Sequence, residues 1–420
     1  MDLKRLISVA RGEVPADLVL KNASVINTFV GEVEQGNVAI CGDRIAGIGD
    51  YDKAKEIIDL QGSYLAPGLL DGHIHIESSM LHPVQYAQAA VPRGISAVVT
   101  DLHEIANVCG LEGIKFVMNW AQKLPLDILL MVPSCVPATT METSGAQISA
   151  EEIKEILALP NAIGLGEMMN FPGVVSGNGE VLSKIIISQG RVIDGHAPGL
   201  GGKELNAYMA AGILSDHEST RFEEGREKLQ RGMYLMIREG SSEKNLDALL
   251  PLVTDKTYHR CFFVVDDRSC SDLLREGDVD AVVRRAISRG LEPVRALQMA
   301  TINTAEYCRR YDSGGFAPGY LANLITITDL SRLEIDMVFY KGKLVARQGK
   351  TLFPAPHTPP ELTDTVRIKP FTVDSLSLRQ QRSNLTEETY PVIEIVPGQI
   401  ITKKRMERAQ VIGGVVMPDL

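Results

Sequence analysis

The middle of the chain, residues 67–315, alternates short apolar runs with amphipathic segments. The apolar runs are rich in β-branched residues and predict eight strands, at 69–76, 95–103, 126–134, 162–168, 191–197, 212–218, 233–239 and 261–267. Amphipathic segments between them predict helices, for example at 113–124, 150–159, 203–212, 222–232 and 279–290. Near-continuous apolar strands separated by helices are typical of a parallel sheet covered by helices.

Eight such units in about 250 residues match the count and size of an α/β fold of the TIM-like (β/α)₈ barrel type. A doubly wound open sheet is the structural alternative. No GxGxxG sequence follows any of the eight expected strands, so the dinucleotide-binding form of that alternative has no support.

The segments on either side of this region have a different rhythm. Residues 17–66 and 316–352 read as short strands that Gly and Asp interrupt about every ten residues, a pattern that favours an antiparallel β-module. We expect the two segments to pair into one small β-sandwich. The domain prediction is therefore a first part of the sandwich at 1–66, the barrel at 67–315 and the second part of the sandwich at 316–352. Residues 353–420 begin with the proline-rich FPAPHTPP and predict a linker followed by the start of a C-terminal module that looks truncated.

Composition narrows the class of partner. The chain has 420 residues, 45% of them hydrophobic and 23% charged, and a formal net charge of −10. We therefore expect neither a nucleic acid nor a membrane as partner, but a small molecule. The N-terminal residues do not read as a signal peptide, and no apolar window is long enough for a membrane span, which predicts a cytoplasmic protein. The six cysteines include no CxxC pair, which argues against a disulfide framework or a zinc knuckle.

Polar side chains recur where the expected barrel strands end. His73 and His75 are two apart on the first strand, so both imidazoles project to one face. The ends of later strands carry Glu167, His196, His217 and the pair Asp266–Asp267. In a barrel these ends converge on one mouth, where active sites are built.

Such a set of imidazoles and carboxylates is sufficient to hold one or two divalent transition metals, of which Zn, Fe and Mn suit these ligands. A bound metal lowers the pKa of water towards neutrality, and a carboxylate beside that water can shuttle its proton. Taken singly, each histidine is more readily explained as a buried imidazole with a hydrogen-bond partner, and each carboxylate as a helix cap. Coincidence is a poor explanation for the whole set, because four of only eight histidines fall at equivalent strand ends.

These residues resemble the amidohydrolase superfamily, with HxH after strand one, His after strands five and six, and Asp after strand eight. Within it, the chain is similar to the adenine deaminase family. The resemblance lies in PGLLDGHIHIESSM, DLHEIANVCG, GLGEMMNFPGV, DGHAPGL, SDHES, KLQRGMYLMIREGS, VVDDRSCSDLLREGD and ATINTAEY. It runs from about residue 18 to the end.

The resemblance implies a binuclear centre of Mn²⁺ or Fe²⁺, with Zn²⁺ as a further possibility. Its ligands would be His73, His75, Glu167, His196, His217 and Asp266. Glu167 stands where many members of the superfamily carry a carboxylated lysine, which argues against a dihydroorotase or hydantoinase. Of the adjacent acids, Asp266 is preferred to Asp267 because it comes first off the strand.

The implied reaction is the hydrolytic deamination of adenine to hypoxanthine and ammonia, a step of purine metabolism. Asp266, Glu167 and His217 form the implied catalytic set, with Asp266 moving the proton and His217 orienting or polarising the attacking oxygen if it leaves the metal shell. The substrate-side candidates are Asp101, His103, Glu104, Arg238 and Asp267. Asp101, His103 and Glu104 have a helix cap as their alternative role, and Arg238 either faces the substrate or pairs with a carboxylate. A homo-oligomer, such as a dimer, is expected although no residue specifies it.

Two departures from the family pattern leave alternatives open. Family members usually continue into a fuller C-terminal domain, and Asp278 stands where many relatives carry histidine, for which we expect a modest effect on substrate fit. The alternatives are a hydrolase that opens a cyclic amide, and a barrel retained as a scaffold or regulatory subunit.

Overall fold

The two segments that flank the barrel form one nine-stranded sheet. The computed structural model describes residues 2–139, 141–365, 368–379, 387–397 and 400–417. The sheet has the order β18-β17-β16-β15-β5-β1-β2-β3, with β4 beside β1. Its strands are β1 (Ala16–Asn27), β2 (Glu32–Cys41), β3 (Arg44–Gly49), β4 (Ala54–Asp59), β5 (Tyr64–Pro67), β15 (Leu324–Asp329), β16 (Glu334–Tyr340), β17 (Lys343–Arg347) and β18 (Lys350–Thr351).

The junction between the two halves of this sheet is the antiparallel pair of β5 and β15, with Leu65 opposite Thr326. Leu20, Val38, Leu65 and Phe339 are fully buried in the core that both halves share. The expectation that the flanking segments join into one β-module is therefore confirmed. An N-terminal helix that the sequence analysis did not predict, α1 (Leu3–Ala10), is capped by Asp2 and buries Leu6 and Val9.

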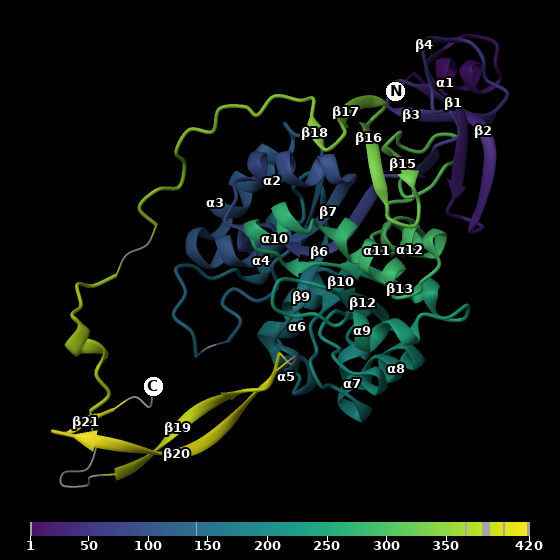
Figure 1. The fold of residues 1–420 in the computed structure, drawn as a ribbon. Coiled ribbons are helices and arrows are strands. Elements are labelled where there is room, and N and C mark those ends of the chain that lie inside the picture. The colour runs from purple at the N-terminus through teal and green to yellow at the C-terminus, as the bar shows by residue number, and fades with distance from the viewer. Residues whose placement is uncertain (1, 140, 366–367, 380–386, 398–399, 418–420) are drawn as a thin grey trace. The chain divides into compact units, whose positions relative to one another are not determined.

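The barrel is built from eight parallel strands with a short continuation of the last one (Figure 1). They are β6 (Leu69–His75), β7 (Ile95–Asp101), β8 (Asp127–Val132), β9 (Ala162–Met168), β10 (Val192–Gly195), β11 (Ser215–Asp216), β12 (Tyr234–Arg238) and β13 (Cys261–Val264), which β14 (Asp266–Asp267) continues. One hydrogen-bonded set runs β10-β9-β8-β7-β6-β14 and a second runs β11-β12-β13. Strand β10 lies beside β11 and β13 beside β6, so the ring closes and the open-sheet alternative is wrong.

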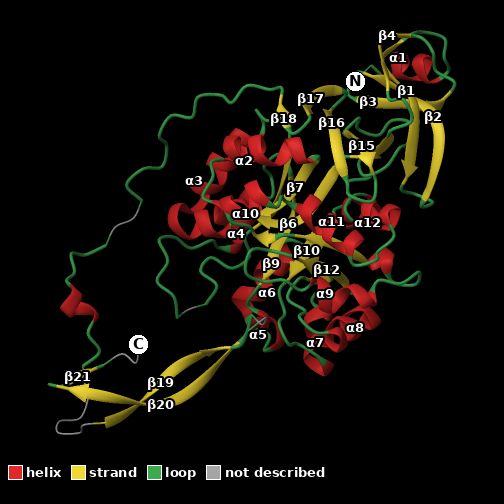
Figure 2. Ribbon diagram, in the orientation of Figure 1, coloured by secondary structure: helices red, strands yellow, loops and turns green. Residues whose placement is uncertain are grey.

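Helices surround these strands, as Figure 2 shows in red. They are α2 (Pro83–Ala90), α3 (His103–Ala121), α4 (Ala150–Ile156), α5 (Phe171–Val175), α6 (Gly179–Ile187), α7 (Gly202–Ala210), α8 (Phe222–Arg231), α9 (Leu246–Leu249), α10 (Cys270–Arg275), α11 (Val279–Ser288), α12 (Pro293–Met299) and α13 (Ile302–Tyr307). Strands β7 and β8 are buried along their whole length, as expected for strands covered on both faces. The first helix after β7 begins at His103, ten residues before the expected segment, and this start places DLHE at the barrel mouth.

Residues 1–361 form one compact unit, and residues 362–420 form a second. In it, β19 (Glu387–Ile395) and β20 (Thr402–Ile412) form an antiparallel ribbon, and β21 (Val415–Val416) pairs with the end of β20. Among the described residues, no helix has the length and apolar character needed to span a bilayer.

Replacing Leu65 with Ala tests the junction of the sheet. Leu65 is fully buried on β5, whereas Ile57 on β4 is 48% exposed. We expect L65A to lower the free energy of unfolding by about 2–5 kcal/mol, because the lost methyl groups leave a cavity. The matched change I57A should cost well under about 1 kcal/mol. Urea unfolding measures both, and equal losses in the two variants would contradict a shared core at this junction.

Candidate metal centre

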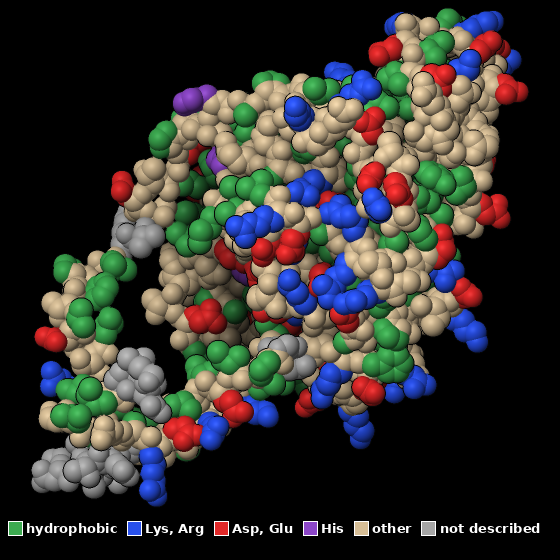
Figure 3. Space-filling model, viewed as in Figure 1, with side chains coloured by type: hydrophobic (Ala, Val, Ile, Leu, Met, Phe, Trp, Pro, Cys, Tyr) green, Lys and Arg blue, Asp and Glu red, His purple; other side chains and the backbone are tan. Residues whose placement is uncertain are grey.

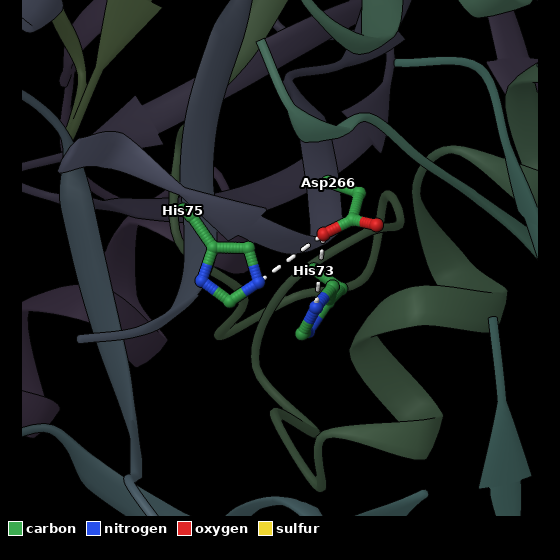
Figure 4. Close-up of side chains that lie close together, drawn as sticks. All are labelled: His73, His75 and Asp266. Atoms are coloured by element: carbon green, nitrogen blue, oxygen red, sulfur yellow. Dashed lines mark ion pairs between the residues drawn. The ribbon is translucent and has the colours of Figure 1, made fainter. Parts of the chain in front are cut away.

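His73, His75 and Asp266 meet at the end of β6. Because successive side chains on a strand point to opposite faces, His73 and His75, which are two residues apart, project to the same face of β6. Strand β14 pairs with β6 in parallel, and this pairing places Asp266 opposite Ile74. Oδ1 of Asp266 lies 3.2 Å from Nε2 of His75 and 3.5 Å from Nε2 of His73, as Figure 4 shows. The three side chains are buried, and one donor atom from each lies within 4.8 Å of the other two, close enough to share one metal ion.

Glu167, at the end of β9, connects this group to the two later histidines. Its Oε1 lies 3.2 Å from Nε2 of His75, while its Oε2 lies 3.2 Å from Nε2 of His217 and 2.5 Å from Nδ1 of His196. The two oxygens of one carboxylate therefore face two different sets of imidazoles. This arrangement suits a carboxylate that bridges two cations.

The hydrogen bonds around His75 leave the correct nitrogen free to bind a metal. Its Nδ1 lies 2.9 Å from the backbone carbonyl oxygen of Asp101, which can only accept. In the neutral ring the proton therefore sits on Nδ1, and Nε2 keeps a lone pair directed towards Glu167 and Asp266. Within the described residues, neither ring nitrogen of His73 nor Nδ1 of His217 has a hydrogen-bond partner, although all are buried. Buried nitrogen and oxygen donors without partners fit a bound transition metal.

The electrostatics of the cluster show the same complementarity. Burial alone would raise the pKa of Glu167, but the imidazoles of His196 and His217 hold it well below its usual range. Burial acts in the same way on Asp266, whose pKa is held well below the ordinary value by His73 and His75. Burial would lower the pKa of His217, yet Glu167 raises it well above the usual range. Burial would likewise lower the pKa of His75, but the carboxylates around this ring raise it well above the usual range. Burial and the neighbouring His217 lower the pKa of His73. Without metal, protons supply the positive charge that the buried carboxylates require.

The backbone at Asp266 distinguishes it from its neighbour. Its φ of 61° lies in the left-handed region, which costs a non-glycine residue about 1–2 kcal/mol and is common at functional sites. With this turn, Asp266 faces the histidines, whereas Asp267 accepts a hydrogen bond from the hydroxyl of Ser78. The structure thus brings Asp266, the preferred residue of the pair, to the imidazoles.

The DLHE residues form a layer next to the centre. Oδ2 of Asp101 accepts the backbone N–H of Glu167 at 2.9 Å, and Nδ1 of His103 lies 3.5 Å from Oε1 of Glu167. Oε2 of Glu104 lies 3.3 Å from Nδ1 of His75. Helix α3 has Leu102 at its N-cap and no side-chain cap, so the alternative role of these residues as helix caps is wrong.

Arg238 and Glu218 form a second support. Arg238 donates to Oδ2 of Asp266 at 2.6 Å and to both oxygens of Glu218, so of its two expected roles the structure shows carboxylate pairing. Glu218 lies 3.3 Å from Nε2 of His217, and the sequence analysis missed it. Alternation along a strand would turn residues 217 and 218 to opposite faces, but β11 ends at Asp216 and the rule lapses there. The feature of the sequence that could have identified Glu218 was its position directly after His217 in SDHES.

Asp278 stands at the N-cap of α11. It is fully buried, caps α11 through the N–H of Val279 at 2.7 Å and accepts the hydroxyl of Tyr86 at 2.6 Å. These contacts give it a structural role in joining α2 to α11. The expected effect on substrate fit stays a prediction.

Comparison with known proteins places the chain in a family. The model of the amidohydrolase family matches residues 64–345. A relative named adenine deaminase from Dehalococcoides mccartyi is 57% identical over 420 residues, covering 100% of this chain and 73% of the relative. Adenine deaminase 2 from Carboxydothermus hydrogenoformans is 48% identical over 413 residues, covering 98% of this chain and 71% of that protein.

Solved structures support the fold. A β-aspartyl dipeptidase from Fervidobacterium islandicum has a TM-score of 0.60 at 18% identity, covering 81% of this chain and 99% of that one. A D-aminoacylase with a binuclear metal centre has a TM-score of 0.57 at 17% identity, covering 81% of this chain and 98% of that one. With the sequence relatives and the family model taken together, the chain belongs to the adenine deaminase family of the amidohydrolases.

Proposed function

We propose that the protein hydrolyses adenine to hypoxanthine and ammonia. It is a hydrolase acting on carbon–nitrogen bonds, as its family membership shows. One structural observation supports this chemistry. The two carboxylate oxygens of Glu167 face two different sets of imidazoles at one barrel mouth. On the face in Figure 3, Lys and Arg are interspersed with Asp and Glu, in keeping with a small-molecule substrate. A homo-oligomer, such as a dimer, stays a prediction.

Two divalent ions fit the donor set. We infer that His73, His75 and Asp266 would hold one, that His196 and His217 would hold the other, and that Glu167 would bridge them. Mn²⁺ or Fe²⁺ is proposed, with Zn²⁺ also suited to these ligands. When bound, such ions supply a water whose pKa is lowered towards neutrality.

Asp266 is the proposed proton carrier. Its Oδ2 is held by Arg238 and its Oδ1 faces the imidazoles, so it can take the proton of the attacking water as the new carbon–oxygen bond forms. It then passes this proton to the departing amine or to the ring nitrogen. In the second case the proton left on the new hydroxyl moves to the amine, so in both cases ammonia leaves as the carbon–nitrogen bond breaks. His217 would orient or polarise the attacking oxygen if it leaves the metal shell, and Glu167 keeps its position through the N–H bond to Asp101.

The exposure of their side chains separates the remaining site candidates into proposed base contacts and positioning residues. The side chains of Glu104 and His103 are 36% and 16% exposed, so we propose that these two contact the base at the mouth. Asp101 and Arg238 are each 1% exposed and already bonded to the ligand residues, so their proposed role is positioning. Asp267, half-buried against Ser78, is the least supported substrate contact.

An ammonia-release assay on Mn-loaded protein tests the function. We expect release with adenine but not ring opening of dihydrouracil or hydantoin, and H73A should lower kcat/KM for adenine at least about 100-fold, since even outer-shell changes cost about 10–100-fold. The exposed His259 gives the matched control H259A, which should keep full activity and metal content. Activity on hydantoins alone would favour the cyclic-amide alternative. Metal well below stoichiometric amounts after gentle purification would favour the scaffold.

Metal rebinding should be pH-dependent. The carboxylates raise the pKa of His75 and His217, so metal must displace their protons to bind. Because those protons leave as pH rises, chelator-stripped protein should bind Mn²⁺ more tightly at pH 8 than at pH 6, by up to about tenfold per pH unit for each proton displaced. Calorimetry in buffers of different ionisation enthalpy measures both affinity and proton release. Equal affinity at the two pH values, with no proton release, would contradict the proposed ligation.

Arg238 can be tested as a positioning residue. R238M keeps most of the stem but leaves Glu218 and Asp266 without their shared counter-charge. We expect kcat/KM to fall by about 10–100-fold with an altered pH profile, because Asp266 loses the group that aims it and a cation bonded directly to it. The control R226M changes an exposed arginine on α8 and should leave both quantities as in the wild type. An unchanged pH profile in R238M would argue against this role.

A further inference from the structure

A cavity of about 430 Å³ lies beside the ends of β8 and β9. Its walls come from the loop that follows β8, from the N-terminal ends of α4 and α6, and from the turn that holds Asn170. Helices α4 and α6 lie against each other (Figure 1). None of the proposed metal ligands lines this space, so it is a separate feature of the barrel's loop face.

Lys184 brings a buried cation to the cavity. Lys184 is 7% exposed, and its Nζ donates to the backbone carbonyl of Ser134 at 3.0 Å. An ammonium group has three donors, and the hydrogen bonds found among the described residues use one of them. The neighbouring carboxylate of Glu152 has its pKa lowered mainly by the bonds from Ser149 and further by the charge of Lys184. Burying an ammonium with unmatched donors is costly, so an anionic partner from outside the chain would be stabilising here.

Two asparagines add donors whose direction is set by helix capping. Oδ1 of Asn178 accepts the N–H groups of Glu180 and Val181, and Oδ1 of Asn170 accepts the N–H of Gly173. Each acceptor is thus committed to a helix start, which leaves the amide Nδ2 as a donor. Both residues line the cavity, so each brings an amide donor to its wall in addition to Nζ of Lys184.

Three acidic residues, Glu142, Glu152 and Glu180, also line the cavity. Oε2 of Glu152 accepts the N–H and the hydroxyl of Ser149, both at 2.8 Å, in the capping box of α4. Glu142 and Glu180 are exposed, so water and salt screen their charges. They act against large polyanions more than against a compact group that reaches Lys184.

We propose that this cavity, the Lys184 pocket, binds a small oxyanion, either phosphate or a carboxylate. The oxyanion accepts from Nζ of Lys184 and from Nδ2 of Asn170 and Asn178. The proposal does not depend on the deaminase reaction.

Thermal unfolding and calorimetry of the metal-loaded protein test it, with inorganic phosphate and acetate as probes and chloride at matched ionic strength as reference. We expect a saturable rise of the unfolding midpoint with at least one probe, and the stronger probe identifies the source. K184M should weaken its binding at least tenfold. N178D keeps a good capping oxygen but replaces the donor with a negative charge, so it should weaken binding equally while the protein folds normally.

Two controls decide the outcome. K154M removes an exposed lysine of α4 and should bind the probe as the wild type does. H73A should also keep binding, because a probe that loses its effect in H73A sits at the metal centre instead. The proposal is overturned if neither probe gives a saturable shift, if K184M and N178D bind like the wild type, or if H73A abolishes binding.

Discussion

The barrel mouth depends on how two buried carboxylates are neutralised. Glu167 and Asp266 are almost fully removed from water, and a buried carboxylate is tolerated only when cations or hydrogen-bond donors surround it. Four imidazoles and the guanidinium of Arg238 provide that surrounding. Because the same side chains accept either protons or metal ions, the electrostatic condition that holds the mouth together also makes it a cation site.

This neutralisation requires exact placement, which comes from a second set of contacts. The N–H of Glu167 is held by Asp101, and Nδ1 of His75 by the carbonyl of the same residue, so one strand end fixes ligands from two others. On the opposite side, Lys228 donates to Oδ2 of Asp216 at 2.9 Å and to the carbonyl of Ala197 at 2.8 Å. It thereby ties together the residues next to His217 and His196. The ligands are positioned by parallel strands, and these outer contacts fix their final orientation.

The sequence was informative wherever a short-range rule applied. Strand period brought His73 and His75 to one face, and barrel geometry brought distant strand ends together, so the cluster could be predicted residue by residue. Contacts set by irregular backbone could not. The positive φ of Asp266 turns it towards the histidines, and Glu218 escapes strand alternation because β11 ends before it. The pairing of Arg238 with both acids depends on three separate strand ends, and no local pattern specifies such an arrangement. Likewise, α1 could not be predicted, because it is a single short helix whose buried residues Leu6 and Val9 are explained only by packing against the sheet.

Two buried lysines of the same barrel differ in how their charges are matched, and this difference distinguishes a structural lysine from one that can bind a ligand. Lys228 is 1% exposed and has two carboxylates, Asp216 and Glu224, together with a carbonyl, so each of its donors is matched. Lys184 is nearly as buried, yet among the described residues its one hydrogen-bond acceptor is the carbonyl of Ser134, and it borders a cavity. A fold that needed Lys184 only for stability would do better with an apolar side chain of similar length, since that avoids the cost of burying a charge. The retained ammonium, in a cavity that two helix-capping asparagines also line, is therefore better explained by a ligand than by packing.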